Sequence, residues 1–268
     1  MTPHTARATP PPQPRHISSP LILRQMPCTH VRVRIRSHLV KGAPLERVAV
    51  VTGDVIDSRK YVATSRTRLN NALRRGFDFV ATALPGVALT TIEFRITAGD
   101  EFQFVLKAPQ RSLESLFLLR SFLAHEAFKP PVRFRAAVGI GQAKYRPARN
   151  ANVRPYEWDG PAFVSAREGL DLIKSQRSPE RWTTIVTGNA EIDHEFNAIL
   201  GLVDHLQRSW TTSQWEAIGW TMRGLKRHET ARRLKVAHQN VSKRLSAAGW
   251  PAVAAATEYV QYRLSPHP

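Results

Sequence analysis

The sequence lacks most of the features that mark secreted or membrane proteins. Cys28 is the single cysteine, so no disulfide can form within the chain, as is usual for proteins of reducing compartments. No run of 18 or more apolar residues is present, and the N-terminus has no apolar stretch typical of a signal peptide. We therefore expect a cytoplasmic protein with no membrane partner.

Acidic residues are scarce at both ends of the chain. Residues 1–45 contain seven Lys or Arg and no acid, residues 46–208 contain 23 basic and 18 acidic residues, and residues 209–268 contain nine and three. The formal net charge is +18. Such an excess favours polyanionic partners such as nucleic acid, although a basic surface can also serve solubility alone.

Length and composition divide the chain into three parts. A Pro-rich basic tail, which we expect to be disordered, covers residues 1–45. A palm-like α/β domain is predicted over residues 46–208 and a small all-α domain over residues 209–268.

The hydrophobic pattern of the central part predicts alternating strands and helices. Strands are expected at residues 48–51, 87–97, 102–106, 132–140 and 182–187. Helices are expected at residues 61–83, 110–128, 161–174 and 190–208, and a basic loop at 142–158. The order begins β-α-β-β-α-β, which is typical of an α+β, ferredoxin-like (palm-type) sheet with helices on one face.

Two Gly-Asp pairs carry the chemical signal of this part. Asp54 follows the first expected strand, and Asp100 lies in the turn of the expected hairpin. If the two carboxylates converge, they would favour a divalent cation, typically Mg²⁺, which also attracts phosphate oxygens. Gly53 and Gly99 would allow the backbone to approach a ligand closely. Both pairs are also common in ordinary tight turns.

Three segments together resemble the SatD family of bacterial proteins: Val51–Arg59, Ala98–Gln103 and Val138–Gly141. More distantly, residues 46–190 resemble the palm-type catalytic domain of class III nucleotide cyclases and GGDEF proteins. In cyclases, an Asp on the first strand and a Gly-Asp hairpin hold metal ions against a triphosphate, and those positions match Asp54 and Asp100. The resemblance to SatD proteins implies a fold but no particular reaction.

A later cyclase helix carries an Asn and an Arg. Arg167 matches the Arg, whereas Phe163 stands where the Asn is expected, a departure from the cyclase pattern. Arg167, with Arg135, would suit the phosphates of a nucleoside triphosphate, because Arg forms bidentate, charge-assisted hydrogen bonds to phosphate. Arg167 could equally be a surface residue that pairs with Asp171.

The C-terminal part resembles the bacterial helix-turn-helix of sigma-factor region 4. Ala231 provides the small residue where two helices cross, Leu234 and Val236 bracket the turn, and Val241 lies inside the second helix. Lys235 stands where a Gly is usual, at a position that often requires a left-handed backbone.

The outward residues of the second helix would contact DNA. Gln239 and Asn240 are candidate base readers, and Ser242 shares their face. The expected phosphate contacts are Lys243, Arg244, Arg232 and Arg233. A three-helix docking module with a basic surface is the alternative.

Three hypotheses follow from these signals. The first is a DNA-binding regulator whose palm-like domain binds nucleotide and metal as a sensor, or is the relic of an enzyme, so no catalytic residue is assigned. The second is an active nucleotidyl cyclase or nucleotidyltransferase that uses Asp54 and Asp100. The third is an interaction module without ligand. The apolar face of residues 251–264 could pack on the helical domain or form a homodimer interface.

Overall fold

The computed structural model describes residues 46–61, 63–84, 95–98, 101–126, 128–147, 156–175 and 181–266. The tail expected at residues 1–45 lies outside the described residues. The described residues belong to one compact unit. The described chain is α+β, as the sequence predicts.

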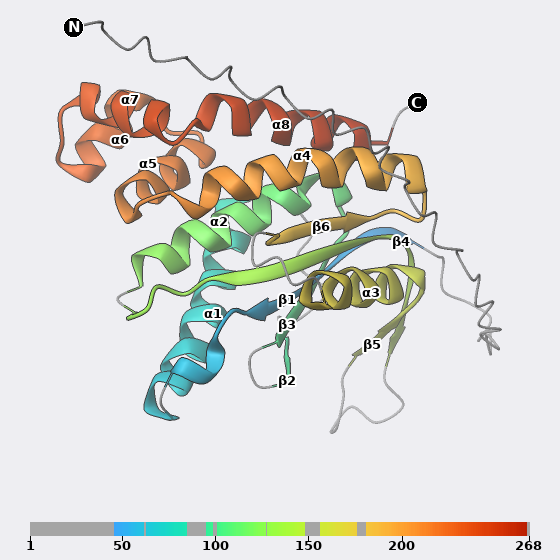
Figure 1. The fold of residues 1–268 in the computed structure, drawn as a ribbon. Helices are drawn as coiled ribbons and strands as arrows, with labels where there is room; N and C mark the ends of the chain where they lie inside the picture. The colour runs from blue at the N-terminus through green and yellow to red at the C-terminus, as the bar shows by residue number, and fades with distance from the viewer. Residues whose placement is uncertain are drawn as a thin grey trace, which may run out of the picture. The chain divides into compact units, whose positions relative to one another are not determined.

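Strands and helices alternate along the first two thirds of this unit, and the remainder is helical (Figure 1). The strands are β1 (Glu46–Val55), β2 (Arg95–Ala98), β3 (Glu101–Leu106), β4 (Phe134–Pro147), β5 (Tyr156–Asp159) and β6 (Thr183–Val186). The α-helices are α1 (Ala63–Ala83), α2 (Ser112–His125), α3 (Pro161–Ser175), α4 (Ala190–Arg208), α5 (Thr212–Met222), α6 (Arg227–Leu234), α7 (His238–Ala247) and α8 (Trp250–Leu264). Two 3-10 helices, η1 (Ser58–Lys60) and η2 (Pro109–Arg111), precede α1 and α2.

The described strands form one sheet in the order β2-β3-β1-β4-β5, and β6 also pairs with β4. β1 is central and runs antiparallel to both β3 and β4, whereas β6 runs parallel to β4. The register places Asp54 opposite Glu101 on β3 and opposite Arg135 on β4. Because directly opposed residues point to the same face, this end of the sheet gathers charged side chains on one side.

Successive residues of β1 serve two different layers, because strand side chains alternate between faces. Val48 and Val50 pack against Ala162 and Ala166 of α3. Ala49, Val51 and Val55 instead join the large core formed with α1, α2 and α4. Asp54 therefore lies on the α3 face of the sheet, as Val48 and Val50 do. The prediction of helices on one face is wrong, because α3 covers the face opposite to α1, α2 and α4.

Glycine on β4 brings α3 close to the sheet. A Cβ at Gly139 would collide with the carbonyl oxygen of Ala162 and the backbone nitrogen of Ala166. On the helix itself, Gly169 lies against Ala137 and Thr184. This close packing holds α3 against the sheet, so that Arg167 and Lys174 of α3 reach the charged side chains at the end of β1 and on β3.

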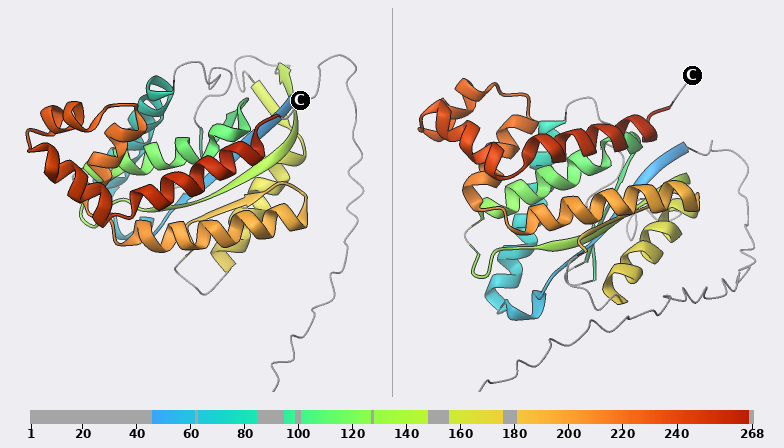
Figure 2. Two further views of the ribbon diagram at one scale, coloured as in Figure 1. Left: turned by 90° about the horizontal axis from the view of Figure 1, so that it is seen from above. Right: turned by 45° about the horizontal axis from the view of Figure 1, so that its top comes forward.

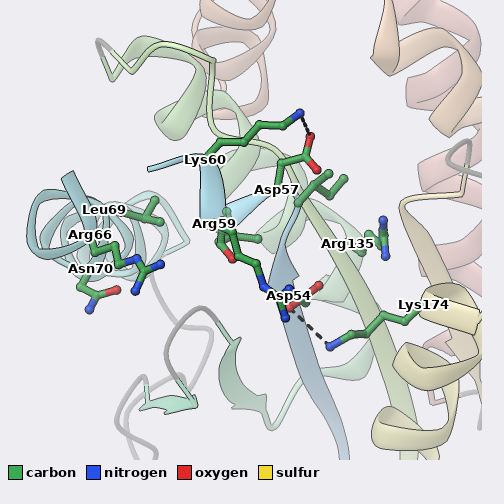
Figure 3. Close-up of a pocket in the computed structure, with 12 residues that line it drawn as sticks. Asp54, Asp57, Arg59, Lys60, Arg66, Leu69, Asn70, Arg135 and Lys174 are labelled. Atoms are coloured by element: carbon green, nitrogen blue, oxygen red, sulfur yellow. Dashed lines mark hydrogen bonds and ion pairs between the residues drawn. The ribbon is translucent and has the colours of Figure 1, made fainter. Parts of the chain in front are cut away.

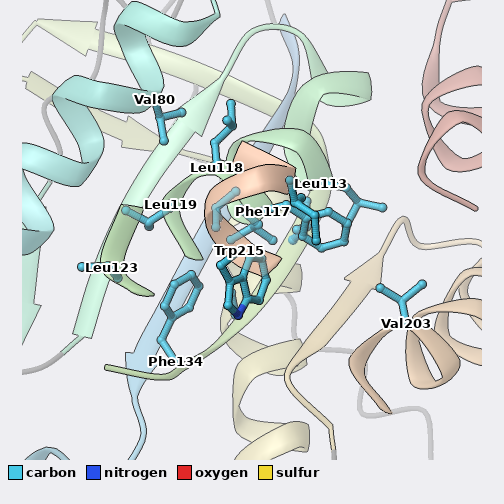
Figure 4. Packing of buried hydrophobic residues seen from close by; sticks show 14 of the residues in the cluster. Val80, Leu113, Phe117, Leu118, Leu119, Leu123, Phe134, Val203 and Trp215 are labelled. Atoms are coloured by element: carbon cyan, nitrogen blue, oxygen red, sulfur yellow. The ribbon is translucent and has the colours of Figure 1, made fainter. Parts of the chain in front are cut away.

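The C-terminal helices share the core of the sheet domain. Trp215, Ala217 and Ile218 of α5 are buried in the same cluster as α2, and Figure 4 shows Trp215 beside Phe117 of α2. The Ser121 hydroxyl donates to the carbonyl of Trp215 over 3.0 Å. Seen from above, α8 lies between α2 and α4 (Figure 2). The predicted domain boundary at residues 208/209 falls between α4 and α5, and the described helices on both sides of it belong to one compact unit.

A buried ion pair connects α2, β6 and α4. Arg120 is 6% exposed and donates to Gln207 (2.7 Å), Thr183 (2.9 Å) and the carbonyl of Trp182 (3.2 Å). The carboxylate of Asp204, which is fully buried, accepts from the backbone nitrogens of Trp182 and Thr183 at 2.7 Å each. The two charges lie 3.7 Å apart. These bonds hold the parallel edge of the sheet to the helical layer.

The structure differs from the sequence prediction at residues 142–158. The expected loop begins as strand, because β4 continues to Pro147 and pairs antiparallel with β5. Lys144 stands opposite Asp159, a pair of opposite charges that favours strand pairing.

Candidate functional site

The candidate site begins where β1 ends. Asp54 is 9% exposed and shares the α3 face of the sheet with Glu101 and Arg135. Two carboxylates on neighbouring strands repel each other unless cations lie close by.

Helix α3 supplies those cations. The Lys174 ammonium is 2.9 Å from Glu101 Oε1 and 3.5 Å from Asp54 Oδ1. Arg167 Nη1 donates to Glu101 Oε2 over 3.0 Å. Arg167 and Lys174 lie two helical turns apart and therefore share one side of α3.

The pKa values follow from these contacts. Burial acts to raise the pKa of Glu101, but hydrogen bonds from Lys174 and Arg167 outweigh it, so the pKa lies below its ordinary value. Burial acts to lower the pKa of Lys174, but the hydrogen bond to Glu101 and the charge of Asp54 outweigh it, so that pKa is raised. Both groups are therefore held in their charged forms at neutral pH.

A pocket of about 640 Å³ opens beside this cluster, between the end of β1, η1 and α1 (Figure 3). Asp57 occupies a left-handed conformation (φ 58°) at the turn and accepts a hydrogen bond from Lys60 over 2.7 Å. The basic residues around the pocket are Arg59, Lys60, Arg66, Arg135 and Lys174, and the acidic ones are Asp54 and Asp57. The lining therefore has an excess of positive charge, with Asp54 as its most buried acid.

A family model described as the SatD family matches residues 48–253. The chain belongs to the SatD family. The family predicted from the motifs is thereby confirmed. A comparison with curated proteins gives no match.

Solved structures that resemble this SatD-family chain include nucleotide cyclases. One is the catalytic core of a rhodopsin-guanylyl cyclase with converted specificity in complex with ATPalphaS (16% identity, 47% of this chain and 72% of that chain, TM-score 0.39). A bacterial light-regulated adenylyl cyclase has 8% identity over 53% and 76%, with a TM-score of 0.40. The adenylyl cyclase CyaB from P. aeruginosa has 11% identity over 57% and 83%, with a TM-score of 0.39.

The predicted DNA-binding regulator is wrong as the main function of this SatD-family chain. The solved structures named above are adenylyl and guanylyl cyclases, which correspond to the second hypothesis. Ala231 and Val241, the apolar positions of the predicted helix-turn-helix, are buried with Leu245 in the same core cluster as the sheet. The turn between α6 and α7 does have the expected backbone, with Lys235 at φ 52°.

The residues predicted to contact DNA lie on and beside α7. Gln239, Asn240, Lys243 and Arg232 are exposed, and Ser242 is half-buried. Arg244 lies 3.6 Å from the carboxylate of Glu216. Arg233 stacks over the ring of Trp220 at 4.9 Å. Arg244 and Arg233 thus have partners within the helical layer.

The structure describes only some of the residues predicted to bind nucleotide and metal, and not all of those line the pocket. Asp54 lines the pocket, whereas Gly99 and Asp100 lie outside the described residues. Gly53 makes room for the core, because a Cβ there would collide with the ring of Phe102. Arg167 contacts Glu101 across the α3 face rather than lining the pocket.

Sequence reasoning missed Lys174 and gave Glu101 no role. The seven-residue spacing of Arg167 and Lys174, which puts both on one side of a helix, could have indicated that Lys174 lies near the same carboxylates as Arg167. Arg66, on α1, carried no such signal, since its place depends on how α1 lies against β1. Within the described residues, no three of His, Cys, Asp and Glu gather as metal ligands, and no helix is long and apolar enough to cross a membrane.

Proposed function

We propose that this SatD-family chain binds a nucleoside triphosphate in the pocket beside β1 and acts as a nucleotidyl cyclase or nucleotidyltransferase. The observation that carries the proposal is the pocket itself, which five basic side chains line together with Asp54 and Asp57. Its volume of about 640 Å³ lies within the range of small-molecule sites. A polyphosphate is the part of a nucleotide that this charge would bind.

The basic side chains suit phosphate in two ways. Arg59, Arg66 and Arg135 offer planar guanidinium groups, which bind phosphate through paired hydrogen bonds. Lys60 and Lys174 offer mobile point charges. Because these residues come from η1, α1, β4 and α3, a bound polyphosphate would join four elements around the end of β1.

The carboxylates fit a magnesium ion. Mg²⁺ prefers oxygen ligands and is usually held by one or two carboxylates together with waters and substrate phosphates. Asp54 and Glu101 would supply the protein ligands, and the remainder would come from phosphate and water. When bound, Mg²⁺ would neutralise charge on the phosphates.

The strand order β2-β3-β1-β4, antiparallel throughout, supports the palm-type, ferredoxin-like description of the sheet. In nucleotidyl transfer, an acceptor hydroxyl attacks the α-phosphorus, the bond to the β-phosphate breaks and pyrophosphate leaves. Phe163 packs against the small core under α3, so the position of the cyclase Asn is apolar here. The acceptor, either the 3′-hydroxyl of the same nucleotide or that of another molecule, decides between cyclase and transferase.

The test combines binding and turnover in the full chain. Thermal-shift and calorimetric titrations with ATP and GTP, with and without Mg²⁺, should show stabilisation of about 2.7 kcal/mol at about 100 times the Kd. Arg66→Met should weaken binding about tenfold, because one charge-assisted hydrogen bond is lost. Asp54→Asn should abolish the Mg²⁺ dependence and the release of pyrophosphate.

Matched controls come from the same helix. Arg74→Met and Asp78→Asn change exposed α1 residues that do not line the pocket, and both should bind nucleotide as the wild type does. Chromatography of the product separates a cyclic nucleotide from a transferred one. The proposal fails if no nucleotide stabilises the protein, or if Arg66→Met and Arg74→Met behave alike.

A further inference from the structure

A single lysine joins the two carboxylates at the end of β1. Lys174 Nζ lies 2.9 Å from Glu101 Oε1 on β3 and 3.5 Å from Asp54 Oδ1 on β1. Figure 3 shows the lysine reaching from α3 toward Asp54. Arg167 Nη1 contacts the other oxygen of Glu101, Oε2, at 3.0 Å.

The position of this ammonium is the one that a bridging cation would take. Asp54 and Glu101 are opposed across β1 and β3, so their charges would repel at close range without a cation between them. A divalent cation bound to both carboxylates would compete with the lysine for the same oxygens. The two cations are therefore alternatives at this point.

The three side chains differ in freedom. The carboxyl side chains stand on strands and are 12% exposed each, whereas the Lys174 side chain is 36% exposed and stands in the last turn of α3. A lysine has a flexible four-carbon stem and a compact charge. The carboxylates are thus fixed, and the ammonium can leave toward the adjoining pocket, which Lys174 also lines.

We propose that Lys174 is an exchangeable counter-cation of the Asp54–Glu101 pair, which a divalent cation displaces when it arrives with a polyphosphate. The displaced ammonium then turns to the phosphates in the pocket. This inference rests on the proposed function. Its consequence is selectivity, because the site binds free divalent cations weakly and metal with polyphosphate together strongly.

Removing the lysine charge should expose the carboxylates to metal. In the full chain without nucleotide, Mn²⁺ binding is measured at neutral pH by electron paramagnetic resonance of the free ion. Lys174→Met keeps the length of the side chain and should bind Mn²⁺ at least about tenfold more tightly than the wild type, a change of about 1.4 kcal/mol. Lys174→Arg keeps the charge and should stay close to the wild type.

Arg167→Met is the matched control, since it removes a cation that contacts Glu101 from the same side of α3. It should raise Mn²⁺ affinity less than Lys174→Met does. The inference is overturned if Lys174→Met leaves Mn²⁺ affinity unchanged or lower, or if Arg167→Met raises it equally. Urea unfolding establishes that each variant is folded, and Lys174→Gln replaces Lys174→Met if the latter is not.

Nucleotide titrations keep the two proposals apart. If the wild type binds no nucleotide, the proposed function fails, yet the Mn²⁺ comparison still reports on Lys174. If nucleotide binds and the Mn²⁺ affinities of wild type and Lys174→Met agree, the exchange fails while the proposed function stands.

Discussion

Two clusters of carboxylates and cations hold different parts of this SatD-family protein together, and they are built differently. In the inner cluster, Asp204 is bound by two backbone nitrogens and Arg120 by a carbonyl, a hydroxyl and an amide. In the outer cluster, Asp54 and Glu101 are held by the flexible side chains of α3. Partners fixed by the backbone cannot exchange, whereas partners on mobile side chains can.

The pKa values report the same contrast. In the inner cluster burial dominates, lowering the pKa of Arg120 to about 10 and raising the pKa of Asp204. In the outer cluster the attraction outweighs burial, so the pKa of Glu101 is lowered and that of Lys174 is raised. The inner pair bears a desolvation penalty that only its many hydrogen bonds offset. The outer pair retains contact with solvent, as a site that receives a ligand must.

The largest expected effect comes from the inner cluster. Arg120→Met should lower the free energy of unfolding by about 3–5 kcal/mol, because it leaves the buried carboxylate of Asp204 without its counter-charge. The measurement is urea unfolding followed by circular dichroism.

The same substitution at an exposed ion pair provides the control. Arg75 lies 2.8 Å from Glu126 with its side chain 53% exposed, and Arg75→Met should change stability by less than about 1 kcal/mol. Equal losses in the two variants would remove the distinction between fixed and exchangeable pairs.

A smaller effect is expected where α3 rests on the sheet. Gly139→Ala should destabilise the protein by about 1–3 kcal/mol, because the added methyl group collides with the backbone of α3. Displacement of α3 should also withdraw Lys174 and Arg167 from the carboxylates. Urea unfolding measures the first effect, and Mn²⁺ affinity, which should rise, measures the second.

Gly201→Ala on α4 is the control for glycine replacement. Its Cβ would meet only the Arg181 guanidinium at 3.5 Å, so we expect unchanged or slightly higher stability. A loss of stability as large as that of Gly139→Ala would mean that the close approach of α3 is not the cause.

The sequence predicted the elements that depend on local pattern. Asp54 could be placed at the end of a strand because an apolar run and a polar turn meet there. The short strand β5 was missed, since its pairing with β4 depends on a chain reversal that leaves little periodicity. The positions of Glu101 and Lys174 also depend on tertiary packing, because the packing of α3 on β1 and β4 brings Lys174 to the carboxylates of β1 and β3.

The same limit explains the mistaken DNA-binding function. Ala231 and Val241 satisfy a helix-turn-helix pattern, but any small helical layer that covers a core needs apolar residues at such positions. Buried charges gave no warning either: Arg120 and Asp204 read as ordinary helical residues until the helices are packed. The apolar pattern alone shows which face of a helix is buried, but it does not show which element of the protein, or which partner molecule, buries it.

The pH dependence of stability should have opposite signs for the two clusters. We expect this effect to be smaller than those of Arg120→Met and Gly139→Ala. The pKa of Glu101 is lower in the folded protein than its ordinary value of 4.5, so its contribution to stability is present above that value and is lost as pH falls through the folded pKa. The pKa of Asp204 is raised above 3.8, so its contribution falls as pH rises from that value through the folded pKa. Between about pH 3 and 7, Glu101→Gln should therefore flatten the rise of stability with pH, and Asp204→Asn should steepen it. Urea midpoints measured across this range give both slopes, and slopes that change in the same direction would contradict the assignment of attraction to one cluster and burial to the other.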